Sequence, residues 1–344
     1  MAEIVPESNR ENQPNKSNSD NEVVLSLQDL KTYFFVREGV VKAVDGVSYD
    51  VHKGEFIALV GESACGKSVS SMSILRLIAS PPGLIVGGKV MFKGENLLEV
   101  SEEKMRKIRG NQISMIFQDA TTSFNPVIRV GKQLSESLIL HKKMSKEKAR
   151  QESLRLMKSV GIPDPENRIN DYPYQFSGGM QQRIMIAMAI SCNPDVIIAD
   201  EPTTALDVTT QEQILKVLDD LRKTYGISVI LITHNLGIVA RFADRLNVMY
   251  AGKIVESGLT NDIYLHPHHP YTKGLLASVP RLDRPRTNNL RAIEGLPPNL
   301  LKLPKGCAFA PRCKFATEQC LKEQPVKKLV NNGGAHYSAC LLEG

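Results

Sequence analysis

The alternation of apolar and polar residues near the start of the chain is typical of an α/β protein. Apolar residues at every second position over 47–51 predict one strand, and the apolar run 56–60 predicts another. The stretch 67–78 carries apolar residues at three-residue spacing, which predicts a helix that stops before the Pro-Pro-Gly at 81–83. We therefore expect a strand, a loop and a helix, in that order.

Both patterns continue through the middle of the chain. A charged, helix-period stretch over 130–160 ends at the Gly-Ile-Pro of 161–163, and we expect a helical insert there. Strand-like runs at 196–199 and 229–233 flank a helix-period stretch over 211–225. This order predicts βαβ crossovers and a mainly parallel sheet.

Shifts in composition divide the chain into three parts. Residues 1–22 are polar and lack the apolar run of a signal peptide, so they indicate a flexible tail. Residues 23–260 carry the α/β pattern, with the helical insert at about 120–180. Residues 261–344 are rich in Pro and then contain Cys, which predicts a separate C-terminal module.

Charge and length narrow the classes of function. The chain has 344 residues, with 43 basic against 37 acidic side chains, and this mild excess fits an anionic ligand or a membrane surface equally well. It does not point to nucleic acid. No stretch approaches the roughly 18–20 apolar residues that a membrane-spanning helix needs. We expect a cytosolic protein, in which six Cys suggest metal ligands or reactive groups before disulfides.

The segment GESACGKS at 61–68 matches the phosphate-binding loop Gly-x4-Gly-Lys-Ser between a predicted strand and a predicted helix. Its glycines let backbone N–H groups surround phosphate oxygens, the lysine neutralises them, and the serine hydroxyl can bind Mg²⁺. A chance match is expected in roughly one chain of this length per hundred. The predicted ATP-binding residues are Gly61, Ser63, Gly66, Lys67 and Ser68.

Two acids and a histidine follow predicted strands. Asp200 and Glu201 come directly after 196–199, at the edge where ligands of open α/β sheets bind. We expect Asp200 to hold Mg²⁺ through water and Glu201 to act as the general base. His234 follows 229–233 and could contact the γ-phosphate and orient Glu201. The alternatives are an Asp-Glu-Pro that only caps a strand and a structural histidine.

Ser177-Gly178-Gly179 precede an apolar helix predicted over 182–191. The serine side chain and the free N–H groups of the first helical turn would bind an anion there. The alternative is a helix cap with no ligand.

These segments together resemble the nucleotide-binding subunits of ABC transporters over about residues 24–260. Ser177, Gly178 and Gly179 resemble the family signature, which binds ATP. Gln118 is similar to the Q-loop glutamine, which implies a catalytic role and Mg²⁺ binding, and Asp207 resembles the D-loop aspartate. The resemblance makes Tyr33 the candidate that stacks on adenine, with Phe34 or Phe35 as alternatives.

The resemblance implies an α/β fold: a P-loop NTPase, ABC-type nucleotide-binding domain with a helical subdomain and a small Cys-containing C-terminal extension. It also implies that two such domains meet head to tail, with each ATP between the Lys67 loop of one and the Ser177 segment of the other. Two departures from the usual pattern are Met180 in place of Gln and Asn235 in place of Asp. Neither removes a catalytic group.

The C-terminal sequences HPYTKGLL at 269–276 and GCAFAPRC at 306–313 are similar to the extension of oligopeptide and dipeptide importer ATPases, including nickel-import relatives. In that group four cysteines bind a [4Fe–4S] cluster. The matching residues here are Cys307, Cys313, Cys320 and Cys340. Four thiolates also suit Zn²⁺, and a set of unrelated thiols is the plain alternative.

We therefore expect an ATP-hydrolysing subunit of a binding-protein-dependent importer of di- and oligopeptides, bound peripherally to the cytoplasmic face of the cell membrane. The implied partners are a homologous, non-identical ATPase, two integral-membrane permease subunits and, indirectly, an extracellular or periplasmic peptide-binding protein, with no nucleic acid. The alternatives are a nickel importer ATPase, a soluble non-transport ABC ATPase and a regulatory nucleotide switch without turnover.

Overall fold

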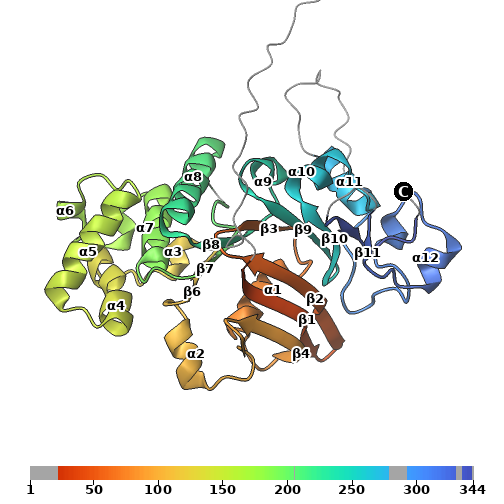
Figure 1. The fold of residues 1–344 in the computed structure, drawn as a ribbon, viewed down its shortest axis with the longest axis horizontal. Helices are drawn as coiled ribbons and strands as arrows, with labels where there is room; N and C mark the ends of the chain where they lie inside the picture. Colours follow the sequence, from red (N-terminus) through yellow and green to blue (C-terminus); the bar gives the residue numbers. More distant parts are fainter. Residues whose placement is uncertain (1–21, 205, 279–292, 331–334, 343–344) are drawn as a thin grey trace, which may run out of the picture.

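Two β-sheets with helices on their faces make up the fold (Figure 1). The computed structural model describes residues 22–204, 206–278, 293–330 and 335–342. The predicted tail at 1–22 lies almost wholly outside the described residues. The strands are β1 (Val23–Val36), β2 (Gly39–His52), β3 (Phe56–Val60), β4 (Gly83–Phe92), β5 (Glu95–Asn96), β6 (Ile113–Ile116), β7 (Val196–Asp200), β8 (Ser228–Thr233), β9 (Arg245–Tyr250), β10 (Lys253–Leu259), β11 (Lys328–Leu329) and β12 (Tyr337–Ser338).

The helices occur between these strands and at both ends of the larger sheet. They are α1 (Lys67–Ile74), α2 (Glu102–Ile108), α3 (Ala120–Ser123), α4 (Val130–Lys142), α5 (Lys146–Ser159), α6 (Pro165–Arg168), η2 (Pro173–Gln175), α7 (Gly178–Ile190), α8 (Val208–Tyr225), α9 (Leu236–Phe242), α10 (Thr260–Leu265), α11 (Pro270–Ala277), η3 (Ala310–Arg312) and α12 (Glu318–Lys322). Among the helices of the described residues, none combines the length and the apolar character needed to cross a bilayer.

The larger sheet has the order β11-β12-β10-β9-β3-β8-β7-β6. The five strands from β9 to β6 run parallel, whereas β10, β12 and β11 add to the edge in antiparallel fashion. The smaller sheet, β2-β1-β4-β5, is antiparallel. The mainly parallel sheet predicted from the βαβ pattern is therefore confirmed, and the carboxyl ends of its parallel strands meet at one edge.

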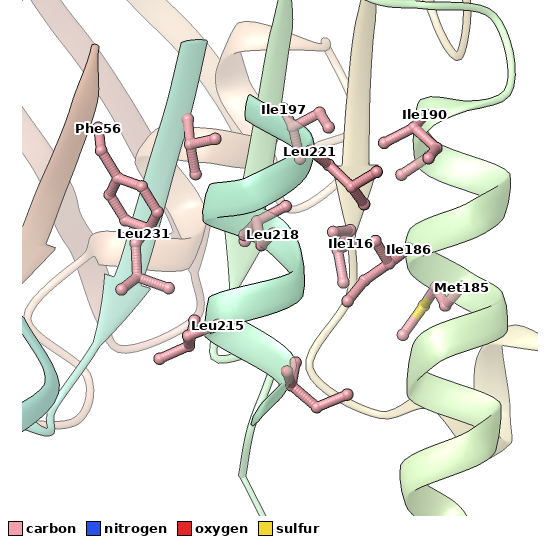
Figure 2. Packing of buried hydrophobic residues seen from close by; sticks show 14 of the residues in the cluster. Phe56, Ile116, Met185, Ile186, Ile190, Ile197, Leu215, Leu218, Leu221 and Leu231 are labelled. Carbon is pink, nitrogen blue, oxygen red and sulfur yellow. The ribbon is translucent and has the colours of Figure 1, made fainter. Parts of the chain in front are cut away.

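Alternate residues of the central strand β3 face two different cores. Phe56, Ala58 and Val60 pack into the core under the helices, and Ile57 and Leu59 pack into the core toward the smaller sheet. All five are at most 1% exposed. Figure 2 shows the first core, where helices α8 and α7 place leucines, isoleucines and a methionine against the strands. Burial on both faces explains why these strands are continuous apolar runs in the sequence.

Two helix boundaries differ from the pattern-based prediction. The helix expected over 67–78 ends at Ile74, and the chain then turns at Arg76, whose φ is +52°. The helical stretch expected over 130–160 is two helices, α4 and α5. They are separated by Lys143, which adopts a left-handed conformation, and by Ser145, whose hydroxyl caps α5. Residues with positive φ follow the ends of α1 and α4, and the spacing of apolar residues does not reveal them.

The helical insert forms a lobe beside the sheet, drawn in yellow and green in Figure 1. At the opposite end of the molecule the C-terminal segment, defined here as residues 261–344, joins the larger sheet through β12 and β11. A buried pair secures this junction, because His336 Nε2 lies 2.7 Å from Glu256 Oε1 and both side chains are fully buried. The division of the chain at residue 260 stays a prediction.

Candidate active site

The phosphate loop between β3 and α1 depends on two glycines. Gly61 has φ +154° and Gly66 has φ +104°, conformations that side chains disfavour. A Cβ on Gly61 would lie 2.2 Å from the carbonyl oxygen of Met249, and one on Gly66 would lie 2.0 Å from that of Ala43. Only glycine fits at both positions, so the loop can curl tightly against β9 and β2.

The Lys67 side chain contacts the backbone of this loop. Its Nζ donates to the carbonyl oxygens of Gly61 and Glu62 at 2.8 and 2.9 Å, and the residue is 5% exposed. Ser63 is exposed on the loop. Because the loop gathers an ammonium group and the N-terminus of α1, it can receive a phosphate.

Ser68 and Asp200 meet beside the loop. Ser68 Oγ donates to Asp200 Oδ1 at 2.9 Å, although the two residues come from different motifs. Asp200 is 6% exposed, and this burial raises the pKa of its carboxyl group, while the Ser68 hydrogen bond opposes the shift. A buried carboxylate beside a serine hydroxyl is a suitable oxygen pair for Mg²⁺.

Glu201 is the point where three segments of the chain meet. Its carboxylate accepts hydrogen bonds from Gln118 Nε2 at 3.1 Å and Thr204 Oγ1 at 2.9 Å, and His234 Nδ1 lies 3.3 Å from it. Its backbone has φ +45°, which is uncommon outside glycine, and its N–H donates to the Ile232 carbonyl. The predicted grouping of Gln118, Glu201 and His234 is thus present in the geometry, whereas their roles stay predictions.

Ser177 and Asp207 each cap the helix that follows them. Ser177 Oγ accepts from the Met180 N–H at 3.4 Å at the start of α7, and Asp207 Oδ1 accepts from the Thr210 N–H at 3.0 Å at the start of α8. Ser177 and Gly178 are exposed, and Gly179 is half-buried. Among the described residues no hydrogen bond joins Ser177 to the phosphate loop. The start of α7 is therefore open to solvent at Ser177 and Gly178.

Tyr33 lies on β1, where its hydroxyl donates to Asp45 Oδ1 at 2.6 Å. Desolvation and this carboxylate raise the pKa of the phenol to about 12. Lys42 Nζ lies 5.6 Å from the ring centroid, within the range of a cation–π contact. Adenine stacking by Tyr33 stays a prediction.

Comparison with known proteins explains why these residues occur together. The ABC transporter family model matches residues 44–204, and the model described as oligopeptide/dipeptide transporter, C-terminal region, matches residues 255–320. The dipeptide transport ATP-binding protein DppD of Bacillus subtilis strain 168 is 52% identical over 322 residues, which are 94% of this chain and 95% of DppD.

This chain belongs to the ATP-binding proteins of the ABC transporter family. The oligopeptide transport ATP-binding protein OppD of the same organism is 50% identical over 314 residues, 91% of this chain and 87% of OppD. The ABC transporter cassette MJ0796, solved as a dimer bound to ADP and Pi, is 27% identical with a TM-score of 0.62, covering 69% of this chain and 98% of that one. The chain therefore has the P-loop ABC ATPase fold and is an ABC-type ATPase.

The prediction of an iron–sulfur cluster in the C-terminal segment is wrong. Cys307, Cys313, Cys320 and Cys340 line one small cavity, but in the part of the chain that the structure describes no three His, Cys, Asp or Glu side chains are placed to hold a metal ion. The cavity offers about 10 Å³, the room for about one water molecule. The Zn²⁺ alternative fails on the same geometry.

The surroundings of these thiols give the physical reason. Burial raises the pKa of Cys307, Cys313 and Cys340, which favours the protonated thiol over the thiolate that metal binding requires. Phe309 and Leu341 line the same cavity. Cys192, which lies outside this cavity, is fully buried.

Three functional contacts were not predicted from the sequence. Thr204 bonds to Glu201, and its place three residues later in the same turn is the signal that could have identified it. Tyr271 Oη accepts a hydrogen bond from the Glu62 N–H at 2.8 Å, and Arg312 pairs with the Glu62 carboxylate. Sequence spacing gives no sign of these two contacts, because they join positions more than 200 residues apart.

Proposed function

We propose that this chain hydrolyses ATP to power the uptake of di- and oligopeptides through a binding-protein-dependent ABC importer. The observation that carries the proposal is the convergence of Gln118, Thr204 and His234 on the carboxylate of Glu201, beside the Ser68–Asp200 pair. A general base held in this way next to a phosphate loop is the arrangement that hydrolysis of a phosphoanhydride requires.

The residues present fit ATP with Mg²⁺. Lys67 and the N–H groups of the glycine loop would bind the phosphates, and Ser68, Asp200 and Gln118 would hold Mg²⁺, which supplies charge neutralisation of the phosphate oxygens. The raised pKa of Asp200 supports this assignment, because a buried carboxylate without a cation is costly. Glu201 would take the proton of the attacking water, and His234 would fix the orientation of Glu201.

The peptide substrate rests on the relatives. DppD and OppD are named for dipeptide and oligopeptide transport, and their match extends over the C-terminal segment. They support peptides and give no support to the nickel alternative. The helix start at Ser177 is exposed to solvent and could face a second molecule, which supports a head-to-tail pair with a homologous ATPase. We place the pair on the cytoplasmic face of the membrane, with two permease subunits.

Purification of the chain with its membrane subunits and partner ATPase, followed by reconstitution into vesicles, tests the proposal. We expect ATP-dependent accumulation of di- or oligopeptides that requires the binding protein. Nickel ions serve as the competing substrate. Uptake of nickel without peptide uptake, or ATP hydrolysis by the purified chain that responds to ribosomes or DNA and not to the membrane subunits, would overturn it.

A further inference from the structure

The phosphate loop carries an acidic side chain whose charge is neutralised from the far end of the chain. Arg312 Nη1 and Nη2 donate to the two carboxylate oxygens of Glu62 at 2.6 and 2.9 Å. The Arg312 side chain is 5% exposed and that of Glu62 is 24% exposed. A bidentate arginine–carboxylate pair that is largely buried is among the stronger ion pairs that proteins form.

The C-terminal segment also holds the backbone of the same loop residue. The Glu62 N–H donates to Tyr271 Oη at 2.8 Å, and Tyr271 is fully buried. Both the backbone and the side chain of Glu62 are therefore fixed by residues beyond position 260.

Further contacts fix the Arg312 side chain in the position from which it pairs with Glu62. Its Nε donates to the Glu294 carbonyl at 3.1 Å, and its guanidinium also reaches the Tyr250 hydroxyl at 3.5 Å. Tyr250, Tyr271 and Phe309 form one aromatic cluster, with ring centroids 4.5 to 5.4 Å apart. The contacts of Tyr271 and Arg312 with the loop are thus supported by this aromatic cluster at the end of β9. Figure 1 shows α11 beside β10 in this region.

The charge of Glu62 matters because of what the loop must receive. ATP brings several negative charges, and a carboxylate in the loop repels them unless a cation lies beside it. The Lys67 ammonium donates to the backbone carbonyl oxygens of Gly61 and Glu62, whereas the Glu62 carboxylate pairs with Arg312. Arg312 supplies the positive charge beside this carboxylate.

We propose that Arg312 and Tyr271 are positioning residues of the ATP site: they hold the phosphate loop through Glu62, and Arg312 cancels a charge that would otherwise oppose ATP. The inference rests on ATP binding at the Lys67 loop. The C-terminal segment is then part of the ATPase and not only an attachment to it.

Calorimetric titration of the full-length chain with MgATP tests the proposal. We expect Arg312→Ala to raise the Kd for MgATP about tenfold, which is about 1.4 kcal/mol. Arg312→Lys, which keeps the charge and loses the fork, should raise it about two- to threefold. Tyr271→Phe, which removes only the acceptor for the Glu62 N–H, should raise it about threefold. Lys314→Ala, which breaks an exposed pair with Glu294 two positions from Arg312, is the matched control and should leave the Kd unchanged.

The double variant Glu62→Gln with Arg312→Ala separates cancellation of the Glu62 charge from bracing of the loop. If Arg312 cancels a harmful charge, removal of that charge should recover most of the lost affinity, and the KM for ATP should recover with it. A Kd that stays as poor as in Arg312→Ala would overturn the proposal, as would an Arg312→Ala chain that binds MgATP as the unaltered chain does. Failure of the unaltered chain to bind MgATP, with Lys67→Ala no different, would instead overturn the proposed function on which this inference rests.

Discussion

Ser68 Oγ donates a hydrogen bond of 2.9 Å to Asp200 Oδ1 and so joins the start of α1 to the end of β7. This contact holds a carboxylate where burial raises its pKa. Without a cation the ionised form destabilises the fold, so the proposed Mg²⁺-binding role of Asp200 would come at the expense of stability.

We therefore expect Asp200→Asn to raise the Tm of the nucleotide-free chain by a few degrees at neutral pH and to abolish the extra stabilisation that MgATP gives. The stability that Asp200 contributes is present below its ordinary carboxyl pKa of 3.8 and is lost as the pH rises through the raised value. The advantage of the variant should thus shrink toward acid pH. Thermal unfolding with and without MgATP at several pH values measures both effects, and an equal response of the two proteins to MgATP would contradict this account.

Glu201→Gln should separate binding from turnover. The amide keeps the size of the side chain but cannot take a proton, so ATP hydrolysis should fall by about 10²–10⁴-fold with the Kd for MgATP nearly unchanged. Phosphate release in the reconstituted complex measures the first, and titration calorimetry the second. Turnover within a few fold of the unaltered protein would assign the base to another residue and leave Glu201 a structural role.

Two substitutions at Ser177 distinguish a helix cap from an ATP contact. Aspartate caps helices about as well as serine, so Ser177→Asp should keep the thermal stability of the chain and abolish ATPase activity in the assembled pair by repelling phosphate. Ser177→Ala should cost about 1 kcal/mol of stability through loss of the cap. If Ser177→Asp retains full ATPase activity, the helix start has no role in nucleotide binding.

His269 gives the chain a sensitivity to acid. Its Nδ1 accepts the Tyr271 N–H at the start of α11, and burial lowers its pKa from 6.5 to about 3. The unfolded chain binds a proton here below about pH 6.5 and the folded chain does not, so stability present above that pH is lost as the pH falls, at up to about 1.4 kcal/mol per pH unit.

His269→Asn keeps an acceptor for the cap and removes the titration. We expect the variant to lose less stability than the unaltered chain between about pH 6.5 and 4.5, as measured by urea unfolding across this range. Parallel pH profiles of the two proteins would show that another group causes the acid sensitivity.

The grouping of Gln118, Glu201 and His234 was predictable from the sequence, because each follows a parallel strand and such strands end at one edge of the sheet. The apolar runs that mark β3, β7 and β8 are strong signals because both of their faces are buried. The break between α4 and α5 was not predictable from apolar spacing, because it depends on the backbone of Lys143 and on a serine cap.

The ion pair between Glu62 and Arg312 could not be predicted from the sequence either, but for a different reason than the break between α4 and α5. Glu62 occupies a free position of the loop pattern, and its partner is 250 residues away. The four C-terminal cysteines show an error in the other direction, because here a contact was predicted that the structure lacks. A family resemblance suggested a metal cluster, but the cavity between these cysteines is too small and too apolar to hold one. Motif spacing describes groups that bind a ligand directly, whereas contacts that support them follow from the packing of the whole chain.

The closeness of Gly61 to the Met249 carbonyl sets a minimum length for a working ATPase. A fragment that stops after Asn235 would retain every nucleotide-binding motif but would lack the strand on which the phosphate loop lies, and MgATP titration of such a fragment should detect no binding. The smallest functional unit therefore extends well past the last motif. A deletion that keeps only the motifs would remove β9, the strand against which the phosphate loop packs.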